Sequence, residues 1–504
     1  MMLNEIHWTQ QAAYPILGML QLVPLLGAGL LLMLGERRDA IVIGRGVAII
    51  ELLLAIDLFR TIKAASPAFQ LAEKLVLLDP FSYHAAADGV TVLFVLLTAL
   101  LVLLLTIYSL VRGLAEPARL LAVILAVEGV LMSLLVTTNL LWFVLASALE
   151  LGLVGYLLWN WATSPEKDTM LARFYQFQGT GLLLLLLGTL LLGWFHAEAT
   201  GGDWSFELAD LSAVPISGAV GSVIFFLLFY GLGIRAPIFP LHGWLPWVTQ
   251  HGNVAIAPAI LLGVKVGIYG LVRFVFPIVP DAVVQWHSFA VAFAAAGVFY
   301  AAFLAFLQSD LRRLMAFAVV SHTSLLIIGL FSLHAEGFQG SILLAVNFGL
   351  AMTVMLFMVG FVYRRTRTTV LDQLGGLFDR IPFIGASFLL GGLSIVGMPG
   401  TPGFDAVHLV LEASIERLGA LLTVAVALGN VVAAGFLLWA FQRAFLAPRG
   451  ETSRVGAIER TLPMEYLVAG SAVAVLLIAG FYLEPWMKLI EAPLHALAGR
   501  FAHP

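Results

Sequence analysis

The strongest constraint in this sequence is a series of apolar runs long enough to cross a lipid bilayer. Residues 89–111 read GVTVLFVLLTALLVLLLTIYSLV, and residues 179–195 read GTGLLLLLLGTLLLGWF. A transmembrane helix needs about twenty apolar residues. The chain is 61% hydrophobic and only 11% charged, whereas soluble domains carry roughly 25% charged residues. The sequence therefore predicts an all-α polytopic membrane protein that contacts the lipid bilayer directly.

The pattern of hydropathy predicts about fourteen transmembrane helices within a single membrane domain, residues 1–504. The expected spans lie near residues 15–34, 41–59, 89–111, 120–137, 140–161, 176–195, 218–234, 254–272, 283–306, 314–332, 341–363, 382–397, 419–441 and 465–484.

Two of these spans are interrupted by glycine and proline. PIFPLHGWLP (237–246) follows one span, and GMPGTPGF (397–404) follows another. Broken helices in corresponding places are typical of transporters built from inverted repeats, in which each break lines a polar cavity. We therefore expect two broken helices near the centre of the membrane.

The distribution of basic residues predicts the orientation. Loops after odd-numbered spans carry most of the arginines and lysines, whereas those after even-numbered spans carry only Arg60, Lys63, Lys74, Arg273 and Arg417. By the positive-inside rule, the odd-numbered loops face the cytoplasm and both termini face the outer side of the membrane.

Several classes of chemistry lack support in the sequence. There is no cysteine, which excludes disulfides and thiolate-bound clusters. The eleven histidines show no metal-binding spacing, and no nucleotide-binding glycine motif is present. A net charge of −4 gives no indication of a nucleic-acid partner. We expect no cofactor and no metal, so any redox chemistry would belong to another protein.

Ionisable residues occur inside the predicted spans. They are Glu128, Glu150, Arg235, Lys265 and His322. A lysine at the middle of a span costs roughly 2.5–3.5 kcal/mol on insertion scales, and such residues are functional by default. With both signs of charge present, a buried chain of titratable groups is favoured over fixed structural ion pairs. Arginine does not release its proton in proteins, so Arg235 can bias Glu150 electrostatically but cannot carry a proton.

Two further groups of polar residues lie elsewhere in the apolar sequence. Asp405, His408 and Glu412 follow the second break at a spacing that places them on one face of a helix. Glu51 and Asp57 lie in the second span, where a side chain that reaches toward the membrane surface or faces a neighbouring subunit is the favoured interpretation.

The sequence resembles the antiporter-like membrane subunits of respiratory complex I, a family shared with multisubunit Na⁺/H⁺ antiporters and membrane hydrogenases. The motifs that carry this resemblance are AADGVTVLFVLLT (86–98), PLHGWLP (240–246), LLGVKVGIYGLVRF (261–274), QSDLRRLMAFAVVSH (308–322), LGGLFD (374–379) and GMPGTPGF (397–404). Any one of them alone is weak, but together they extend through nearly the whole chain. The M-type subunits of bacterial NADH–quinone oxidoreductase are the most similar.

The resemblance implies fourteen helices with two inverted five-helix repeats, residues 118–280 and 283–446. It also implies proton translocation along a central polar axis. By position, Glu150 corresponds to the coupling glutamate of the family, Lys265 to its central lysine, and His322 to the histidine leading to the exit. His242 corresponds to the histidine of the first break.

Three positions depart from the family pattern. Arg235 replaces a lysine that normally pairs with the glutamate, Asn347 replaces a second relay histidine, and Val407 replaces a charged residue of the second broken helix. Asp405 and His408 flank Val407, but neither projects in its direction.

Three functions follow as alternatives. The first is a proton-translocating subunit of a complex-I-like NADH–quinone oxidoreductase, which works with other membrane and peripheral subunits in the bacterial inner membrane. The second is the proton-conducting subunit of an inorganic-carbon accumulation complex with a zinc-dependent, carbonic-anhydrase-like partner, and the third is a non-transporting scaffold. Proton transport is favoured over scaffold, and protons over Na⁺, because Lys265 and His322 carry protons rather than supplying oxygen ligands.

Overall fold

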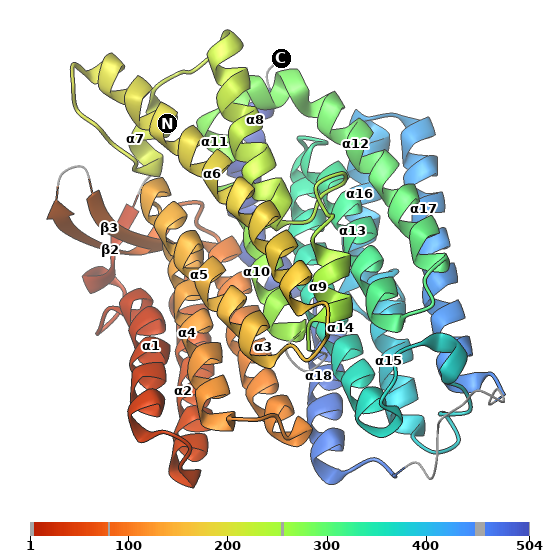
Figure 1. Ribbon diagram of the computed structural model, residues 1–504. Coiled ribbons are helices and arrows are strands. Elements are labelled where there is room, and N and C mark those ends of the chain that lie inside the picture. Colours follow the sequence, from red (N-terminus) through yellow and green to blue (C-terminus); the bar gives the residue numbers. More distant parts are fainter. Residues whose placement is uncertain (1–4, 79–80, 254–256, 449–458, 503–504) are drawn as a thin grey trace.

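The protein is a bundle of long helices that stand side by side, with a small sheet near one end (Figure 1). The computed structural model describes residues 5–78, 81–253, 257–448 and 459–502. The helices are α1 (Ile16–Leu34), α2 (Arg38–Thr61), α3 (Gly89–Arg112), α4 (Pro117–Val136), α5 (Leu140–Trp161), α6 (Lys167–Thr200), α7 (Leu208–Ala213), α8 (Gly218–Arg235), α9 (Leu245–His251), α10 (Ala257–Gly270), α11 (Phe276–Ile278), α12 (Pro280–Phe306), α13 (Leu311–Leu330), α14 (Ala335–Thr366), α15 (Pro382–Ile395), α16 (Pro402–Arg417), α17 (Ala420–Phe441), α18 (Pro463–Phe481) and α19 (Glu484–Ala498).

The helices confirm the predicted membrane architecture. Within the described residues, eleven helices are long and apolar enough to cross a bilayer. Each of the other three predicted spans also coincides with a helix. α2 carries several charged residues, α10 has 14 residues and α15 has 14. The protein is therefore an integral membrane protein, and the figure of about fourteen spans stays a prediction.

Both predicted breaks are present. α8 ends at Arg235 and α9 begins at Leu245, while α15 ends at Ile395 and α16 begins at Pro402. The loop of the first break is held by the indole of Trp244, whose Nε1 donates to the Ile234 carbonyl at 2.9 Å. In the second break, Gly397 and Gly400 have φ values of 88° and 86°, which only glycine adopts without strain.

A three-stranded sheet covers one end of the N-terminal helices and was not anticipated from the sequence. β1 (Glu5–His7) pairs in parallel with β2 (Phe69–Leu78), which pairs in antiparallel fashion with β3 (Phe81–Ala87). His84 of β3 joins this sheet to the rest of the chain, with Nε2 3.1 Å from Glu5 and Nδ1 2.7 Å from Glu207. Burial alone would lower the pKa of His84, but hydrogen bonds to the two carboxylates raise it to about 9.

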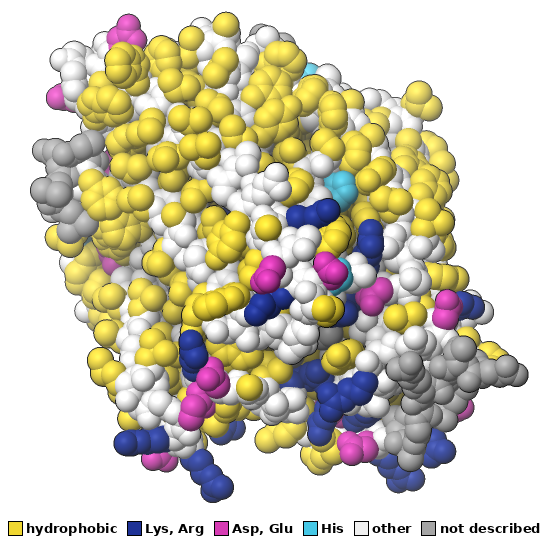
Figure 2. All heavy atoms as spheres, in the orientation of Figure 1, with side chains coloured by type: hydrophobic (Ala, Val, Ile, Leu, Met, Phe, Trp, Pro, Cys, Tyr) yellow, Lys and Arg dark blue, Asp and Glu magenta, His cyan; other side chains and the backbone are white. Residues whose placement is uncertain are grey.

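The basic residues on one face of the bundle are concentrated toward one end. On the face shown in Figure 2, lysine and arginine side chains gather toward the lower end, while the upper part is largely hydrophobic. Both ends of the chain lie at the upper end in Figure 1, away from these basic residues. The two ends of the bundle are therefore electrostatically different.

Candidate functional site

A buried ion pair joins α5 to the end of α8, at the first break. Nη2 of Arg235 donates to Oε2 of Glu150 at 2.6 Å, and both side chains are 10% exposed. Nη1 of the arginine also donates to Ser147 Oγ at 2.8 Å, and Nε to the Gly263 carbonyl at 3.3 Å. These contacts use all three nitrogens of the guanidinium group, so they fix the arginine firmly against the glutamate.

The ion pair depends on a glycine in α10. A Cβ atom at Gly263 would stand 2.2 Å from Oε1 of Glu150, which is much shorter than any real contact. A cavity of about 20 Å³ borders the pair and is lined by Gln178 and Arg235 among other residues. That volume is enough for one water molecule.

Lys265, two residues further along α10, is the second buried cation. It is 5% exposed, and within the described residues it forms no ion pair. Its Nζ lies 4.1 Å from the centroid of the Phe348 ring, a cation–π contact. A cavity of about 10 Å³ beside the lysine is lined by residues that include Thr98 and Thr353.

His322 lies against the same aromatic ring. Its imidazole stacks on Phe348 with the ring centroids 5.5 Å apart and the planes at 21°. Nδ1 is 3.1 Å from the Ala318 carbonyl, one turn back in α13. Nε2 is buried without a hydrogen bond in the described part of the chain and lies near the Ile395 backbone at the end of α15. The structure therefore brings Lys265 and His322 together around Phe348.

Beyond His322, the second break is closed by a pair of polar residues that do not titrate. Asn347 Nδ2 donates to the Ser394 carbonyl at 3.1 Å, and Ser394 Oγ donates to Asn347 Oδ1 at 2.7 Å. Val407 is also buried here, at 8% exposed. The amide fixes the end of α15 but cannot carry a proton.

His242 occupies the loop of the first break, among aromatic rings. It is 7% exposed, and its ring centroid lies 5.5 Å from that of Tyr300 and 6.0 Å from that of Phe239. Its Nδ1 is buried and has no hydrogen-bond partner among the described residues.

The residues predicted on one face of α16 do not point into the bundle. His408 and Glu412 are neighbours, with Nε2 3.8 Å from Oε2, but their side chains are 72% and 46% exposed. Asp405 is partly exposed. The structure therefore does not bring these three residues to Lys265 or His322; it places them on the outer surface of the chain.

A second buried ion pair was missed in the sequence. Arg273 was assigned to a loop, but this assignment is wrong, because Arg273 is 7% exposed and lies in a π-helical turn after α10. Its Nη1 and Nη2 donate to the two carboxylate oxygens of Asp88 at 2.9 and 2.7 Å. The sequence feature that could have indicated this pair is Asp88, an acidic N-cap residue directly before the apolar run of α3.

The interpretation of Glu51 was also wrong. Glu51 is completely buried inside this chain, so it neither reaches toward the membrane surface nor faces a neighbouring subunit. Glu128 of α4 is likewise completely buried, and its carboxyl group interacts electrostatically with that of Glu51. Neither residue forms a hydrogen bond or an ion pair with Glu150 or Arg235 in the described chain.

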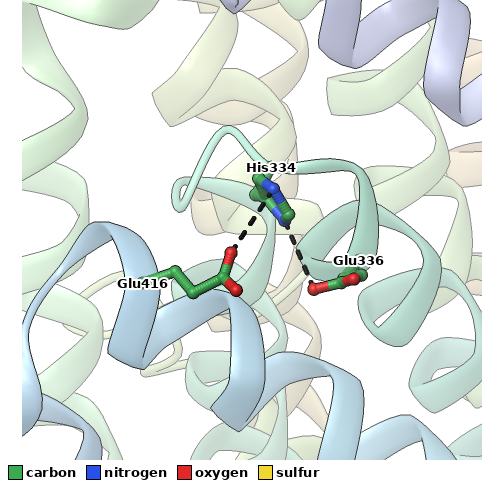
Figure 3. Close-up of side chains that lie close together, drawn as sticks. All are labelled: His334, Glu336 and Glu416. Carbon is green, nitrogen blue, oxygen red and sulfur yellow. Dashed lines mark ion pairs between the residues drawn. The ribbon is translucent and has the colours of Figure 1, made fainter.

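One cluster in the described chain combines a histidine with two carboxylates in a way that could hold a metal ion. Figure 3 shows His334 between Glu336 at the start of α14 and Glu416 at the end of α16. Nδ1 lies 3.5 Å from Glu336 and Nε2 lies 3.6 Å from Glu416. Because the two carboxylates approach opposite nitrogens of the ring, the contacts are those of a histidine bridging two acids.

Comparison with known proteins places this geometry in a family. The model of the family described as "NADH:quinone oxidoreductase/Mrp antiporter, TM" matches residues 137–433, which include Glu150, Arg235, Lys265 and His322. The chain belongs to this family. The match covers more than half of the chain and both broken helices.

Relatives within the NADH:quinone oxidoreductase/Mrp antiporter family match nearly the whole chain. NADH-quinone oxidoreductase subunit M of Mycobacterium tuberculosis is 28% identical, over 97% of each chain. The subunit of the same name from Escherichia coli is 27% identical, over 80% of each chain. A chain of respiratory complex I from Thermus thermophilus superposes with a TM-score of 0.87 at 26% identity, covering 96% of this chain and 100% of that one. A chain of the Mrp complex from Dietzia shares the fold, with a TM-score of 0.86 at 18% identity and coverage of 96% and 97%.

Proposed function

We propose that this chain translocates protons as a membrane subunit of a complex-I-like NADH–quinone oxidoreductase. The observation that carries the proposal is the burial of Lys265 beside His322, with Phe348 in contact with both. A lysine and a histidine are groups that bind and release protons, whereas a sodium site needs several oxygen ligands. The relatives named as NADH-quinone oxidoreductase subunits favour this parent complex over the two alternatives.

The residues have distinct roles in this proposal. Glu150 and Arg235 form an electrostatic switch next to α10, in which the guanidinium keeps its charge at every step. Lys265 holds a proton when a carboxylate charge favours its ammonium form and releases it when that influence weakens. His322 accepts the proton, and His242 exchanges with water at the first break.

The same proposal includes two inverted five-helix repeats, residues 118–280 and 283–446. In each of these segments the fourth long helix is broken, at α8–α9 and at α15–α16. In each, the fifth helix ends in a π-helical turn, Leu271–Val275 after α10 and Gln442–Leu446 after α17. The recurrence of two unusual features in the same order supports a common origin for the two halves.

We further propose that the basic end of the bundle faces the cytoplasm of a bacterial cell and that both termini face the opposite side. The gathering of arginine and lysine side chains toward one end supports this orientation (Figure 2).

The outer face of α16 indicates where a partner subunit binds. His408 and Glu412 are exposed in this chain, yet both belong to the helix that follows the second break. Polar side chains at membrane depth are normally covered by protein or water. A neighbouring membrane subunit that covers this face would also continue the polar route beyond Asn347, which cannot carry a proton itself.

Proton uptake by proteoliposomes that contain the assembled complex tests the proposal. Replacing Lys265 by alanine is expected to abolish the pH gradient, while quinone reduction continues at a reduced rate. Lys488→Ala is the matched control, because Lys488 is exposed and forms an ion pair with the exposed Glu484. Wild-type proton uptake by the Lys265→Ala complex would support the scaffold alternative instead.

A further inference from the structure

Two buried carboxyl groups on the contacting helices α2 and α4 take no part in the Glu150–Lys265–His322 line. Glu51 of α2 and Glu128 of α4 are each 0% exposed. All four of their carboxyl oxygens are buried without a hydrogen-bond partner in the described part of the chain. The two side chains interact electrostatically. This combination is unusual, because buried polar groups in proteins are nearly always hydrogen-bonded.

Both residues lie near the middle of their helices. Glu51 is about 20 Å of helix from the start of α2 and about 15 Å from its end; Glu128 is about 16 and 12 Å from the two ends of α4. An ionised carboxylate at that depth, with neither a cation nor a hydrogen bond, is strongly disfavoured.

No positive charge compensates the two acids. Within the described chain, no ion pair includes Glu51 or Glu128. α1 has no charged side chain. β3 contributes Tyr83, which accepts a hydrogen bond from Gln21, and His84, which is bound to Glu5 and Glu207. The remaining charged and titratable groups on α2, α3, α4, α5 and α10 are Arg38, Asp39, Arg45, Asp57, Arg60, Tyr108, Arg112, Arg119, Glu150, Tyr156, Lys265 and Tyr269.

We propose that Glu51 and Glu128 form a proton-binding dyad in the N-terminal helices, separate from the transport line through Lys265. Two carboxyl groups in one apolar place disfavour each other's ionisation, so the pair gives up its two protons in separate steps and keeps one of them to higher pH. After the first proton is lost, the pair carries a single negative charge that opposes loss of the second proton. The dyad thus binds and releases one proton reversibly, and its ligand is the proton itself.

The proposal concerns the chain at equilibrium and does not depend on transport through Lys265. Its failure would therefore leave the proposed function untouched, and the failure of that function would leave the dyad in place.

Infrared spectroscopy of the full chain in lipid nanodiscs tests the dyad. The wild-type protein at neutral pH is expected to show the C=O stretch of protonated carboxyl groups, and Glu51→Gln and Glu128→Gln are each expected to remove part of it. The double variant should remove both contributions. Glu198→Gln is the matched control, because Glu198 is exposed on α6 and should contribute only to the ionised carboxylate bands.

Alkaline titration separates a dyad from two independent acids. In the wild-type protein the C=O band should disappear in two steps as the pH rises. In either single variant the remaining acid should lose its band in one step, at a lower pH than the second step of the wild type. Because glutamine has the shape of a protonated glutamate, both single variants should retain the wild-type melting temperature, which confirms folding. Any of three results would overturn the proposal. These are ionised carboxylate bands from either residue at neutral pH, bands that shift when NaCl is added, and single variants whose titration matches that of the wild type.

Discussion

Replacing Arg235 by alanine should destabilise the protein by an amount that follows from the contacts of its guanidinium. The arginine makes three hydrogen bonds, one of them to the carboxylate of Glu150, and both members of the ion pair are about nine-tenths buried. Removing one partner of a buried ion pair typically costs ~3–5 kcal/mol, because the other charge stays buried without compensation. We therefore expect the free energy of unfolding to fall by about this amount.

Unfolding of the purified chain by SDS in mixed micelles, followed by circular dichroism, measures this change. The second variant, Arg235→Ala with Glu150→Gln, removes the stranded charge, so it should recover about 2 kcal/mol of the loss. Lys488→Ala is the control, since the Lys488–Glu484 pair is exposed, and it should leave the unfolding curve in place.

Two results would contradict this reasoning. If Arg235→Ala lowered the free energy of unfolding by less than about 1 kcal/mol, the ion pair would be no stronger than an exposed surface pair. If Glu150→Gln gave no recovery in the Arg235→Ala background, the loss would come from the contacts with Ser147 and Gly263 and not from the stranded carboxylate.

Three further predictions use other contacts. Gly263→Ala should displace Glu150 and lower the free energy of unfolding by about 1–3 kcal/mol, a typical overpacking penalty. Gly152→Ala is the control, because no atom lies within 4 Å of the added Cβ; it should leave the SDS unfolding curve unchanged or stabilise the protein. Phe348→Leu should slow proton uptake by proteoliposomes and lower the free energy of unfolding by about 2 kcal/mol, because Lys265 loses a desolvated cation–π contact. An unchanged rate of proton uptake would show that the aromatic ring is not part of the proposed route. The raised pKa of His84, about 9 against an ordinary 6.5, predicts stability that is fully present below about pH 6.5 and is lost as the pH rises through about 9, by roughly 3 kcal/mol. Thermal melting across this range should show the loss in the wild type and not in His84→Gln.

The exposed face of α16 shows why some site residues could not be placed from the sequence. The spacing of His408 and Glu412 correctly predicted that they share one face of a helix. Helical periodicity does not say whether such a face turns toward the centre of the bundle or away from it. That direction depends on how α16 packs against α14 and α17 after the break, which is a tertiary contact.

Glu51 shows the same limit for a charged residue. The interpretation from sequence placed it at a surface, because most glutamates in such positions reach water or a partner chain. In the structure, the packing of α2 against α3 and α4 buries it completely. Arg273 was likewise assigned to a loop, although its side chain turns inward to Asp88.

The sequence by itself determined the membrane architecture, the two broken helices and the resemblance to the family, because each depends on local properties. Apolar length decides whether a helix can span a bilayer, and glycine and proline decide where it is interrupted. Only the tertiary structure decided which ionisable side chains meet. Arg235 reaches Glu150 across 85 residues of sequence, and Lys265 meets His322 only because α10, α13 and α14 converge on one phenylalanine. Contacts between distant segments arise from the packing of whole helices, and no local pattern in the sequence encodes them.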